Sequence, residues 1–355
     1  MLTDPLLEQI LERIPRLRIG VLGDLFLDRY LDIDAGLDEP SLETGLTAYQ
    51  VVQVRSQPGA AGTVINNLAA LGVGSIVPVA VIGDDGEGYE LRQALARIPA
   101  VSPEAILSFP ARRTPTYAKP MRLEPGQPAR ELNRLDIKNR TPTPAEAEEQ
   151  IIRHLELIWP RVDALVVLDQ VSEADCGVVT RRVRDRLAEL GAADPRRFVL
   201  ADSREQIREF RNVCLKPNLR ECSPSPPAAL PPLGERGNRN SAGSDQDKLL
   251  VAVAELARSQ GRPVFCTCAE EGMVVAEPGA APKHVLGFPV SGPIDPVGAG
   301  DSVSAGIVCA RAAGVSLVEA AQFGNLVASI TIQQLGTTGT ASPAQIRARW
   351  REVSL

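Results

Sequence analysis

Hydrophobic and polar residues follow two different periods along this chain of 355 residues. Short apolar runs, typical of strands that are buried on both faces, occur at 17–22, 75–82, 164–169, 197–202 and 263–268. Segments with apolar residues at helical spacing lie at 58–72, 89–98, 143–159, 173–190, 246–260, 300–313 and 316–335. Strands that alternate with helices predict an α/β fold with a mainly parallel central sheet and helices on both of its faces.

Two extended segments, 31–56 and 114–136, do not follow this alternation, and we expect them to pair into a small separate sheet. Residues 1–16 contain an amphipathic helical pattern, with Thr3 placed to cap it. Residues 223–245 are rich in Pro, Ser and Gly, which predicts a flexible loop.

Composition narrows the class of protein. The formal net charge of −6 argues against a broad basic surface, so we expect no nucleic-acid partner. No apolar run approaches the roughly 18 residues that span a membrane, and the first residues lack the basic start of a signal peptide. Six scattered cysteines without a CxxC pair are typical of reduced thiols in a cytoplasmic protein.

The most informative motif is DPVGAGDS at residues 295–302, directly before a helical pattern. Gly298, Ala299 and Gly300 would bring bare backbone N–H groups to a helix N-terminus, where they favour an anion such as phosphate. Asp301 follows in the first turn, where a carboxylate could accept a proton from an attacking hydroxyl. The alternative is an aspartate that only caps the helix.

Four further motifs occur in order: GDLFLD at 23–28, PGAAGTVINNLAALG at 58–72, KPNLRE at 216–221 and TCAEEG at 267–272. With DPVGAGDS, they resemble the motifs of the ribokinase-like (PfkB) carbohydrate kinases over about residues 17–345. The chain is similar in particular to the kinase half of the bifunctional heptose-phosphate kinase/adenylyltransferases, as GDLFLDRY, the P-T-x-x-K pattern ending at Lys119 and LGTTGTASP indicate.

This resemblance implies a kinase domain at 17–345 that binds ATP and Mg²⁺. Asp301 would be the base, and Gly298, Ala299 and Gly300 would form the anion hole. Around the nucleotide, Asn218 and Glu221 would lie near the phosphates, with Glu221 holding Mg²⁺ through water. The resemblance also places Thr267 and Gly272 along the nucleotide, Asn325 near the adenine, and carbonyls around Asp295 and Val297 at a monovalent cation such as K⁺.

At the acceptor end, the resemblance implies that sugar hydroxyls are bound by Asp24, Asp28, Gly59, Thr63 and Asp169. The segments 31–56 and 114–136 would form a lid over the sugar, which in many relatives is also a homodimer contact. This end departs from the family pattern. Thr63 stands where an Asn is usual, Gln170–Glu173 replaces a Tyr-x-Lys-Gly sequence, and Ala269 replaces a Gly.

Several of these residues have structural alternatives. Asp24 could form an Asx-turn, Asn218 could supply turn chemistry, and Asn325 could pack within its helix. Asp202, at the end of a predicted strand, could either cap a turn or line the site.

The function that these motifs predict is ATP-dependent phosphorylation of a hydroxyl on a sugar or sugar phosphate. One alternative is a nucleoside kinase of the same fold, which would need aromatic residues in the lid, where only Tyr49 and Tyr117 are available. Another is a non-catalytic nucleotide or sugar sensor. A dinucleotide oxidoreductase is disfavoured because Gly23-Asp24-Leu25 stands where GxGxxG would follow the first strand.

Overall fold

The computed structural model of the chain describes residues 2–222 and 242–354. Most of the predicted loop at 223–245 lies outside the described residues. Its last residues, from Ala242, belong to helix α7 (Ala242–Gln260), which extends the helix predicted at 246–260.

Among the described residues, the central sheet has nine strands in the order β16-β15-β14-β13-β12-β11-β1-β6-β7. Strands β7 to β14 along this order are parallel, and β15 and β16 add an antiparallel edge. The strands are β1 (Arg18–Gly23), β6 (Ser75–Gly83), β7 (Ile106–Phe109), β11 (Ala164–Asp169), β12 (Phe198–Ser203), β13 (Cys214–Leu215), β14 (Val264–Thr267), β15 (Met273–Ala276) and β16 (Lys283–Val285). The predicted fold class is confirmed.

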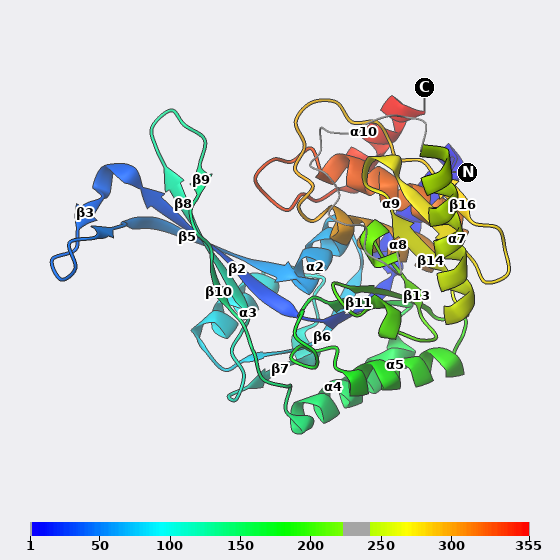
Figure 1. Cartoon of the computed structure of the whole chain (residues 1–355), viewed down its shortest axis with the longest axis horizontal. Coiled ribbons are helices and arrows are strands. Elements are labelled where there is room, and N and C mark those ends of the chain that lie inside the picture. Colours follow the sequence, from blue (N-terminus) through cyan, green and yellow to red (C-terminus); the bar gives the residue numbers. More distant parts are fainter. Residues whose placement is uncertain (1, 223–241, 355) are drawn as a thin grey trace.

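Helices cover both faces of this sheet, which is why its central strands are apolar on both sides (Figure 1). All six residues of β11 are buried. In the view of Figure 1, α4 and α5 lie below the sheet and α8 and α9 lie above it. The helices are α1 (Asp4–Arg13), α2 (Ala61–Ala70), α3 (Gly86–Ala96), α4 (Ala145–Ile158), α5 (Arg181–Ala193), α6 (Leu219–Cys222), α8 (Ala299–Ala312), α9 (Leu317–Thr331) and α10 (Pro343–Val353).

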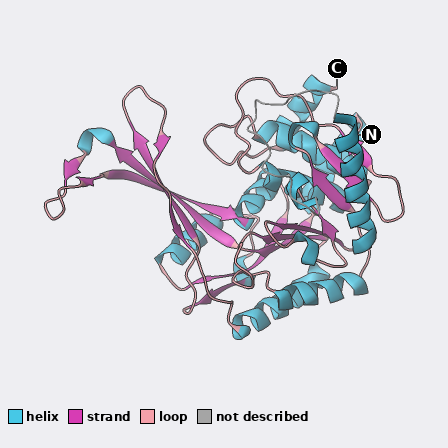
Figure 2. Ribbon diagram, in the orientation of Figure 1, coloured by secondary structure: helices cyan, strands magenta, loops and turns pink. Residues whose placement is uncertain are grey.

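A second sheet projects from this core (Figure 2). Its strands run in the order β10-β8-β2-β5, with the short β9 paired to β8. They are β2 (Leu25–Asp34), β5 (Val51–Ala60), β8 (Thr116–Leu123), β9 (Arg130–Glu131) and β10 (Leu135–Ile137), while β3 (Glu39–Pro40) and β4 (Thr47–Ala48) pair at the tip. The two predicted extended segments therefore do pair with each other, although the sheet begins at Leu25, directly after β1, rather than at residue 31.

Two local predictions were wrong. Helix α5 begins at Arg181 instead of residue 173, because the Asp24 carboxylate accepts hydrogen bonds from the backbone N–H groups of Gln170 and Val178 and holds this stretch in turns. The hydroxyl of Thr180 then caps α5. At the N-terminus, Thr3 occupies the cap position of α1 but makes no side-chain cap hydrogen bond.

Close packing of α8 on α9 fixes the direction of α8. A Cβ atom added at Gly306 would lie 2.9 Å from the Cα atom of Gly324, so the two helices approach backbone to backbone. Any larger side chain at this crossing would push the helices apart. The N-terminus of α8, which carries the DPVGAGDS motif, is thereby held against the core.

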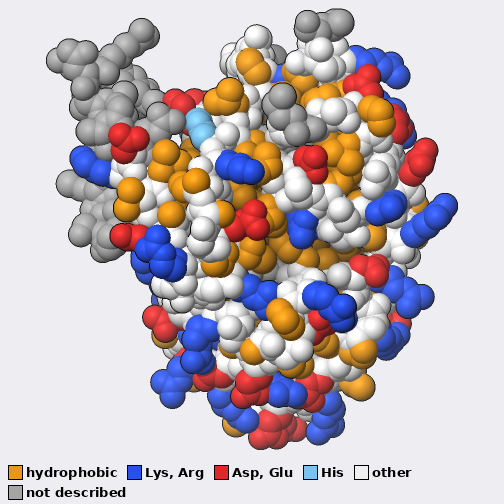
Figure 3. Space-filling view, turned by 90° about the vertical axis from the view of Figure 1, so that its right-hand side faces the viewer, with side chains coloured by type: hydrophobic (Ala, Val, Ile, Leu, Met, Phe, Trp, Pro, Cys, Tyr) orange, Lys and Arg blue, Asp and Glu red, His pale blue; other side chains and the backbone are white. Residues whose placement is uncertain are grey.

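The surface described by the structure carries both signs of charge. Figure 3 shows acidic and basic side chains interspersed on one face of the molecule. Within residues 2–222 and 242–354, no helix is both long enough and apolar enough to cross a membrane.

Candidate active site

The DPVGAGDS turn presents free backbone N–H groups at the start of α8. Gly298 has a left-handed backbone with φ 80°, and the Ala299 N–H donates to the Pro296 carbonyl over 3.1 Å. Within the described part of the chain, the N–H groups of Gly300 and Asp301 have no acceptor. These two donors and the helix dipole together favour an anion in front of the turn.

Lys216, to which the sequence analysis gave no role, lies beside this turn at the end of β13. Only 4% of its surface is exposed. Its Nζ lies 2.8 Å from Oδ2 of Asp202, at the end of β12. The same Nζ is 3.5 Å from the position that a Cβ atom would take on Gly300. The ends of β12 and β13 and the N-terminus of α8 therefore meet at one point, and Asp202 belongs to this cluster.

Burial and neighbouring charges change the proton affinity of these groups. Burial, and then the negative charge of Asp202, raises the pKa of Asp301 to about 7, although the Lys216 ammonium opposes this shift. Burial disfavours the charged form of Lys216, but the carboxylates of Asp202, Asp301 and Glu221 outweigh it and raise the lysine pKa. Asp301 can therefore gain or lose a proton near neutral pH.

Asn218 and Glu221 form a compact turn next to Lys216. The backbone N–H of Asn218 donates to Oε2 of Glu221 over 2.8 Å, and its side-chain amide donates to Oε1 over 2.7 Å. Asn218 also bridges to Thr267 on β14. Burial raises the pKa of Glu221, and the charge of Asp202 adds to the rise. The turn chemistry considered for Asn218 is thus present, and it holds Glu221 toward the cluster.

The donor set suits Mg²⁺ held through water. Lys216 faces three carboxylates, those of Asp202, Glu221 and Asp301, so the cluster carries excess negative charge that a divalent cation would balance. No group of three or more His, Cys, Asp or Glu side chains converges on one point within residues 2–222 and 242–354. Glu221 and Asp202 would therefore contact the hydration shell of the ion, as Mg²⁺ commonly allows.

Asp28, on β2 of the projecting sheet, lies near enough to Asp301 to act on its charge. Its carboxylate contributes to the raised pKa of Asp301. Oδ2 of Asp28 lies 3.1 Å from Nζ of Lys119 on β8, and this ammonium also donates to the Tyr30 hydroxyl over 3.2 Å. A Cβ atom at Gly59 would lie 2.9 Å from the Asp28 carboxyl carbon, so only glycine fits there. The sequence analysis named Lys119 only as the end of the P-T-x-x-K pattern and predicted no contact for it.

Thr63 adjoins the DPVGAGDS turn at Gly298. Its side chain is buried, and its methyl group lies 3.5 Å from the position that a Cβ atom would take on Gly298. Thr63 therefore packs behind Gly298, where it supports the turn.

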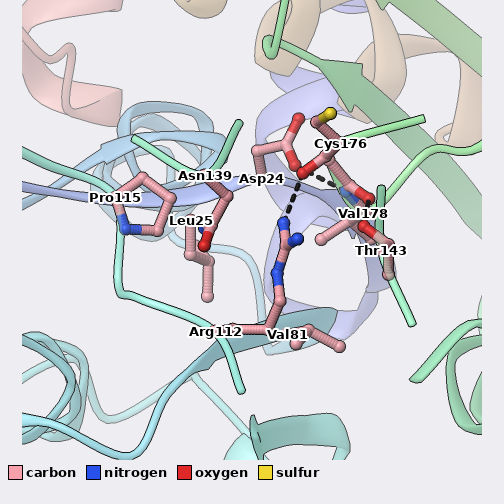
Figure 4. Close-up of a pocket in the computed structure, with 10 residues that line it drawn as sticks. Asp24, Leu25, Val81, Arg112, Pro115, Asn139, Thr143, Cys176 and Val178 are labelled. Carbon is pink, nitrogen blue, oxygen red and sulfur yellow. Dashed lines mark hydrogen bonds between the residues drawn. The ribbon is translucent and has the colours of Figure 1, made fainter. Parts of the chain in front are cut away.

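Asp24 and Asp169, which were both predicted to bind the substrate, are buried and accept hydrogen bonds from other parts of the chain. Oδ1 and Oδ2 of Asp24 accept from the N–H groups of Val178 and Gln170 over 2.7 and 3.0 Å. Figure 4 shows Asp24 beside Arg112, which donates to the Cys176 carbonyl, around a cavity of about 10 Å³. Such a cavity holds about one water molecule, and the substrate contact expected of Asp24 stays a prediction.

Asp169 is buried in the same way. It accepts a hydrogen bond from the Ser203 hydroxyl over 2.7 Å, and burial, with the nearby charge of Asp24, raises its pKa to about 7. The Asp24 carboxylate thus holds the loop at 170–178, and the Asp169 carboxylate links the ends of β11 and β12. The bonds of Asp24 are tertiary contacts and not the local Asx-turn considered from the sequence.

Asn325 and Gly272, which were predicted to lie near the nucleotide, contact the backbone of the chain itself. The Asn325 amide donates to the carbonyls of Val285 and Leu286 over 3.2 and 3.1 Å, so it holds the loop after β16. Gly272 makes the β14–β15 turn with φ 91° and touches the backbone of Gly287.

The Asp295 carboxylate accepts from the N–H groups of Val297 and Gly336 over 3.1 and 3.0 Å. This pair of hydrogen bonds ties the segment 295–297 to residue 336. The proposed cation contacts would therefore come from carbonyls rather than from this carboxylate.

The buried role of Asp24 gives a stability prediction. In Asp24→Ala, the N–H groups of Gln170 and Val178 lose their acceptor, so we expect the free energy of unfolding to fall by about 2–3 kcal/mol in urea denaturation. Asp84→Ala, at an exposed position, is the matched control and should change it by about 0.5 kcal/mol or less. Equal stability of the two variants would show that Asp24 does not hold the loop.

Comparison with known proteins agrees with this geometry. Residues 164–345 match the family described as pfkB family carbohydrate kinase. The chain is 30% identical over 344 residues to Bifunctional protein HldE of Pelobacter propionicus, covering 96% of this chain and 64% of that protein. It is 30% identical over 353 residues to Bifunctional protein HldE of Trichlorobacter lovleyi, covering 97% and 65%. The chain thus spans just under two thirds of the length of these relatives.

Solved structures share the fold at low identity. Ribokinase from Arabidopsis thaliana, complexed with ribose and ATP, has a TM-score of 0.64 at 16% identity, covering 94% of this chain and 98% of that one. Phosphofructokinase-2 from Escherichia coli, in complex with substrates and products, has a TM-score of 0.66 at 16% identity, covering 96% and 100%. The family predicted from the sequence motifs is confirmed: the chain belongs to the pfkB family of carbohydrate kinases, a family of phosphotransferases, and has their ribokinase-like fold.

Proposed function

We propose that this chain transfers the terminal phosphoryl group of ATP to a hydroxyl of a sugar or sugar phosphate. The observation that supports this most is Asp301, a carboxylate with a pKa raised to about 7, in the first turn of α8 beside two free backbone N–H groups. A carboxylate repels phosphate, so its place in an anion site is best explained by a proton-accepting role.

Each residue of the cluster has a defined part in this reaction. Asp301 accepts the proton of the acceptor hydroxyl while that oxygen forms its bond to phosphorus and the bond to the leaving ADP oxygen breaks. The N–H groups of Gly300 and Asp301 stabilise the negative charge on the transferred group. Lys216, held by Asp202 at 2.8 Å, supplies a fixed positive charge at the same place. Mg²⁺, held through water near Glu221, would neutralise charge on the phosphates.

The acceptor side favours a polyol. Asp28 can accept hydrogen bonds from sugar hydroxyls, and Lys119 can donate to a hydroxyl or a phosphate oxygen. We infer that the acceptor is of the heptose-phosphate type or a related sugar. Glu173 stands directly after Ser172, the position where the family pattern has a lysine, and it pairs with Arg140 at 3.5 Å, which offsets part of its negative charge.

A nucleoside acceptor is disfavoured by the two lid tyrosines. The Tyr117 ring packs against Phe26 at 5.1 Å between ring centroids and is covered by the Arg134 guanidinium at 4.0 Å. Arg122 lies 5.6 Å from the centroid of the Tyr49 ring. Both rings already have an arginine beside them, which a stacking base would have to displace.

The proposal predicts acceptor-dependent ADP release. We would measure release with Mg²⁺ and ATP over hexoses, heptoses, their monophosphates and nucleosides near pH 8, above the Asp301 pKa of about 7. Asp301→Asn should reduce the rate by on the order of 10²–10⁴-fold, as expected for loss of a general base. Its ATP affinity, from thermal shift, should stay close to that of the unchanged chain.

Other outcomes separate the alternatives. ATP binding with no acceptor-stimulated release would favour the sensor, and stimulation by nucleosides alone would favour the nucleoside kinase. Absence of ATP binding would refute the proposal.

We also infer that the chain forms a homodimer through the projecting sheet. Val51, Val52 and Val54 on β5 are 45%, 54% and 49% exposed, and Val52 and Val54 share one face of the strand. Such a row of exposed apolar residues is typical of a protein interface.

Light scattering tests this inference. The unchanged chain should have twice the monomer mass. Val52→Glu/Val54→Glu should be monomeric, because a dimer of this variant would have to bury the two glutamate charges in its contact. Leu157→Glu/Val251→Glu, at residues equally exposed on α4 and α7, should remain dimeric. A monomeric unchanged chain would rule out the dimer.

A further inference from the structure

Five arginines line one depression at the end of the central sheet opposite to the candidate active site. The depression has a volume of about 720 Å³ and lies at the amino ends of β1, β11 and β12, whereas Asp202 and Asp169 mark the carboxyl ends of β12 and β11. The six residues of β1 separate the two ends by about 17 Å. We call it the arginine depression, and its lining arginines are Arg16, Arg18, Arg161, Arg196 and Arg197.

The arginines come from segments far apart in the sequence. Arg16 ends the short helix after α1, and Arg18 begins β1. Arg161 ends the short helix after α4, and Arg196 and Arg197 directly precede β12. The fold, rather than a local run of charge, therefore brings five guanidinium groups to one place. In a chain with a net charge of −6, this concentration is unexpected.

Only two carboxylates line the depression, and both have partners already. Asp163 accepts from the backbone N–H of Arg18 over 2.8 Å. Asp194 pairs with Nε of Arg197 at 3.1 Å. Arg197 is fixed further by donating to the Val162 carbonyl and by stacking 5.3 Å from the centroid of the Trp159 ring.

The other guanidinium groups have no carboxylate partner. Within the described residues, no ion pair neutralises the guanidinium groups of Arg16, Arg18, Arg161 and Arg196, and all four are exposed. Guanidinium groups that face one another across a depression repel, and an anion with several charges would relieve this repulsion. The planar N–H fork of arginine matches the oxygens of phosphate.

We propose that the arginine depression binds an oligophosphate, either free or as the phosphate tail of a nucleotide. A volume of about 720 Å³ is within the range of small-ligand sites. Among the described residues, the apolar side chains of its lining are Pro160 and Val162, and the lining offers no aromatic ring on which a nucleotide base could stack. Recognition therefore rests on charge, and this site is separate from the proposed kinase activity.

Trp159 provides a local readout. The chain has two tryptophans, so Trp350→Phe leaves Trp159, under Arg197, as the only indole. In this background and without Mg²⁺, titration with sodium tripolyphosphate should change the Trp159 fluorescence with saturation. The affinity should fall as ionic strength rises. ATP and tripolyphosphate should bind with similar affinity, and AMP more weakly.

Substitution of three of the four unpaired arginines decides the proposal. Arg16→Gln/Arg161→Gln/Arg196→Gln should weaken tripolyphosphate binding by roughly tenfold or more, because charge-assisted hydrogen bonds are lost. The matched control, Arg153→Gln/Arg258→Gln/Arg351→Gln, removes three exposed arginines from three separate helices and should bind as the background does. Circular dichroism should give both variants the same melting temperature.

Two results would overturn the proposal. One is equal tripolyphosphate affinity in the two arginine variants. The other is binding of ATP without binding of tripolyphosphate, which would mean that the base is recognised rather than the charge.

Discussion

The buried ammonium group of Lys216 is the interaction on which the proposed active site depends. It lies among three carboxylates, is paired to Asp202 at 2.8 Å, and adjoins Gly300 at the start of α8. A buried ion pair with one partner removed leaves an uncompensated charge, so these groups hold one another in place. Burial, and then the charge of Asp202, keeps the pKa of Asp301 high. The excess negative charge of the cluster would be balanced by a divalent cation.

The fold supports this cluster from three directions. Strands β12 and β13 end at Asp202 and Lys216, and the backbone contact between Gly306 and Gly324 fixes α8 against α9. The projecting sheet brings Asp28 and Lys119 over the same point from β2 and β8. An acceptor held by this sheet would therefore meet Asp301 and the free N–H groups of α8 together, which is the arrangement that phosphoryl transfer requires.

The sequence predicted local features well because they depend on neighbouring residues. The apolar run at 164–169 is β11, and the GAG turn does begin α8. The sequence did not reveal the ion pair of Lys216 with Asp202, because only the parallel pairing of β12 and β13 brings these two residues together. The same limit explains Asp24: its motif predicts a carboxylate at a strand end, but only the tertiary contact with Val178 shows that it points inward.

The central claim is that burial and neighbouring charge hold the pKa of Asp301 near 7. A titration of the carboxyl groups tests this claim directly. Carboxyl ¹³C resonances of the aspartates would be followed against pH, and the Asp301 signal would be identified by its loss in Asp301→Asn. This distinguishes it from Asp169, whose pKa is also raised to about 7. We predict a midpoint near pH 7 for Asp301. A midpoint near the ordinary aspartate value of about 3.9 would contradict the account.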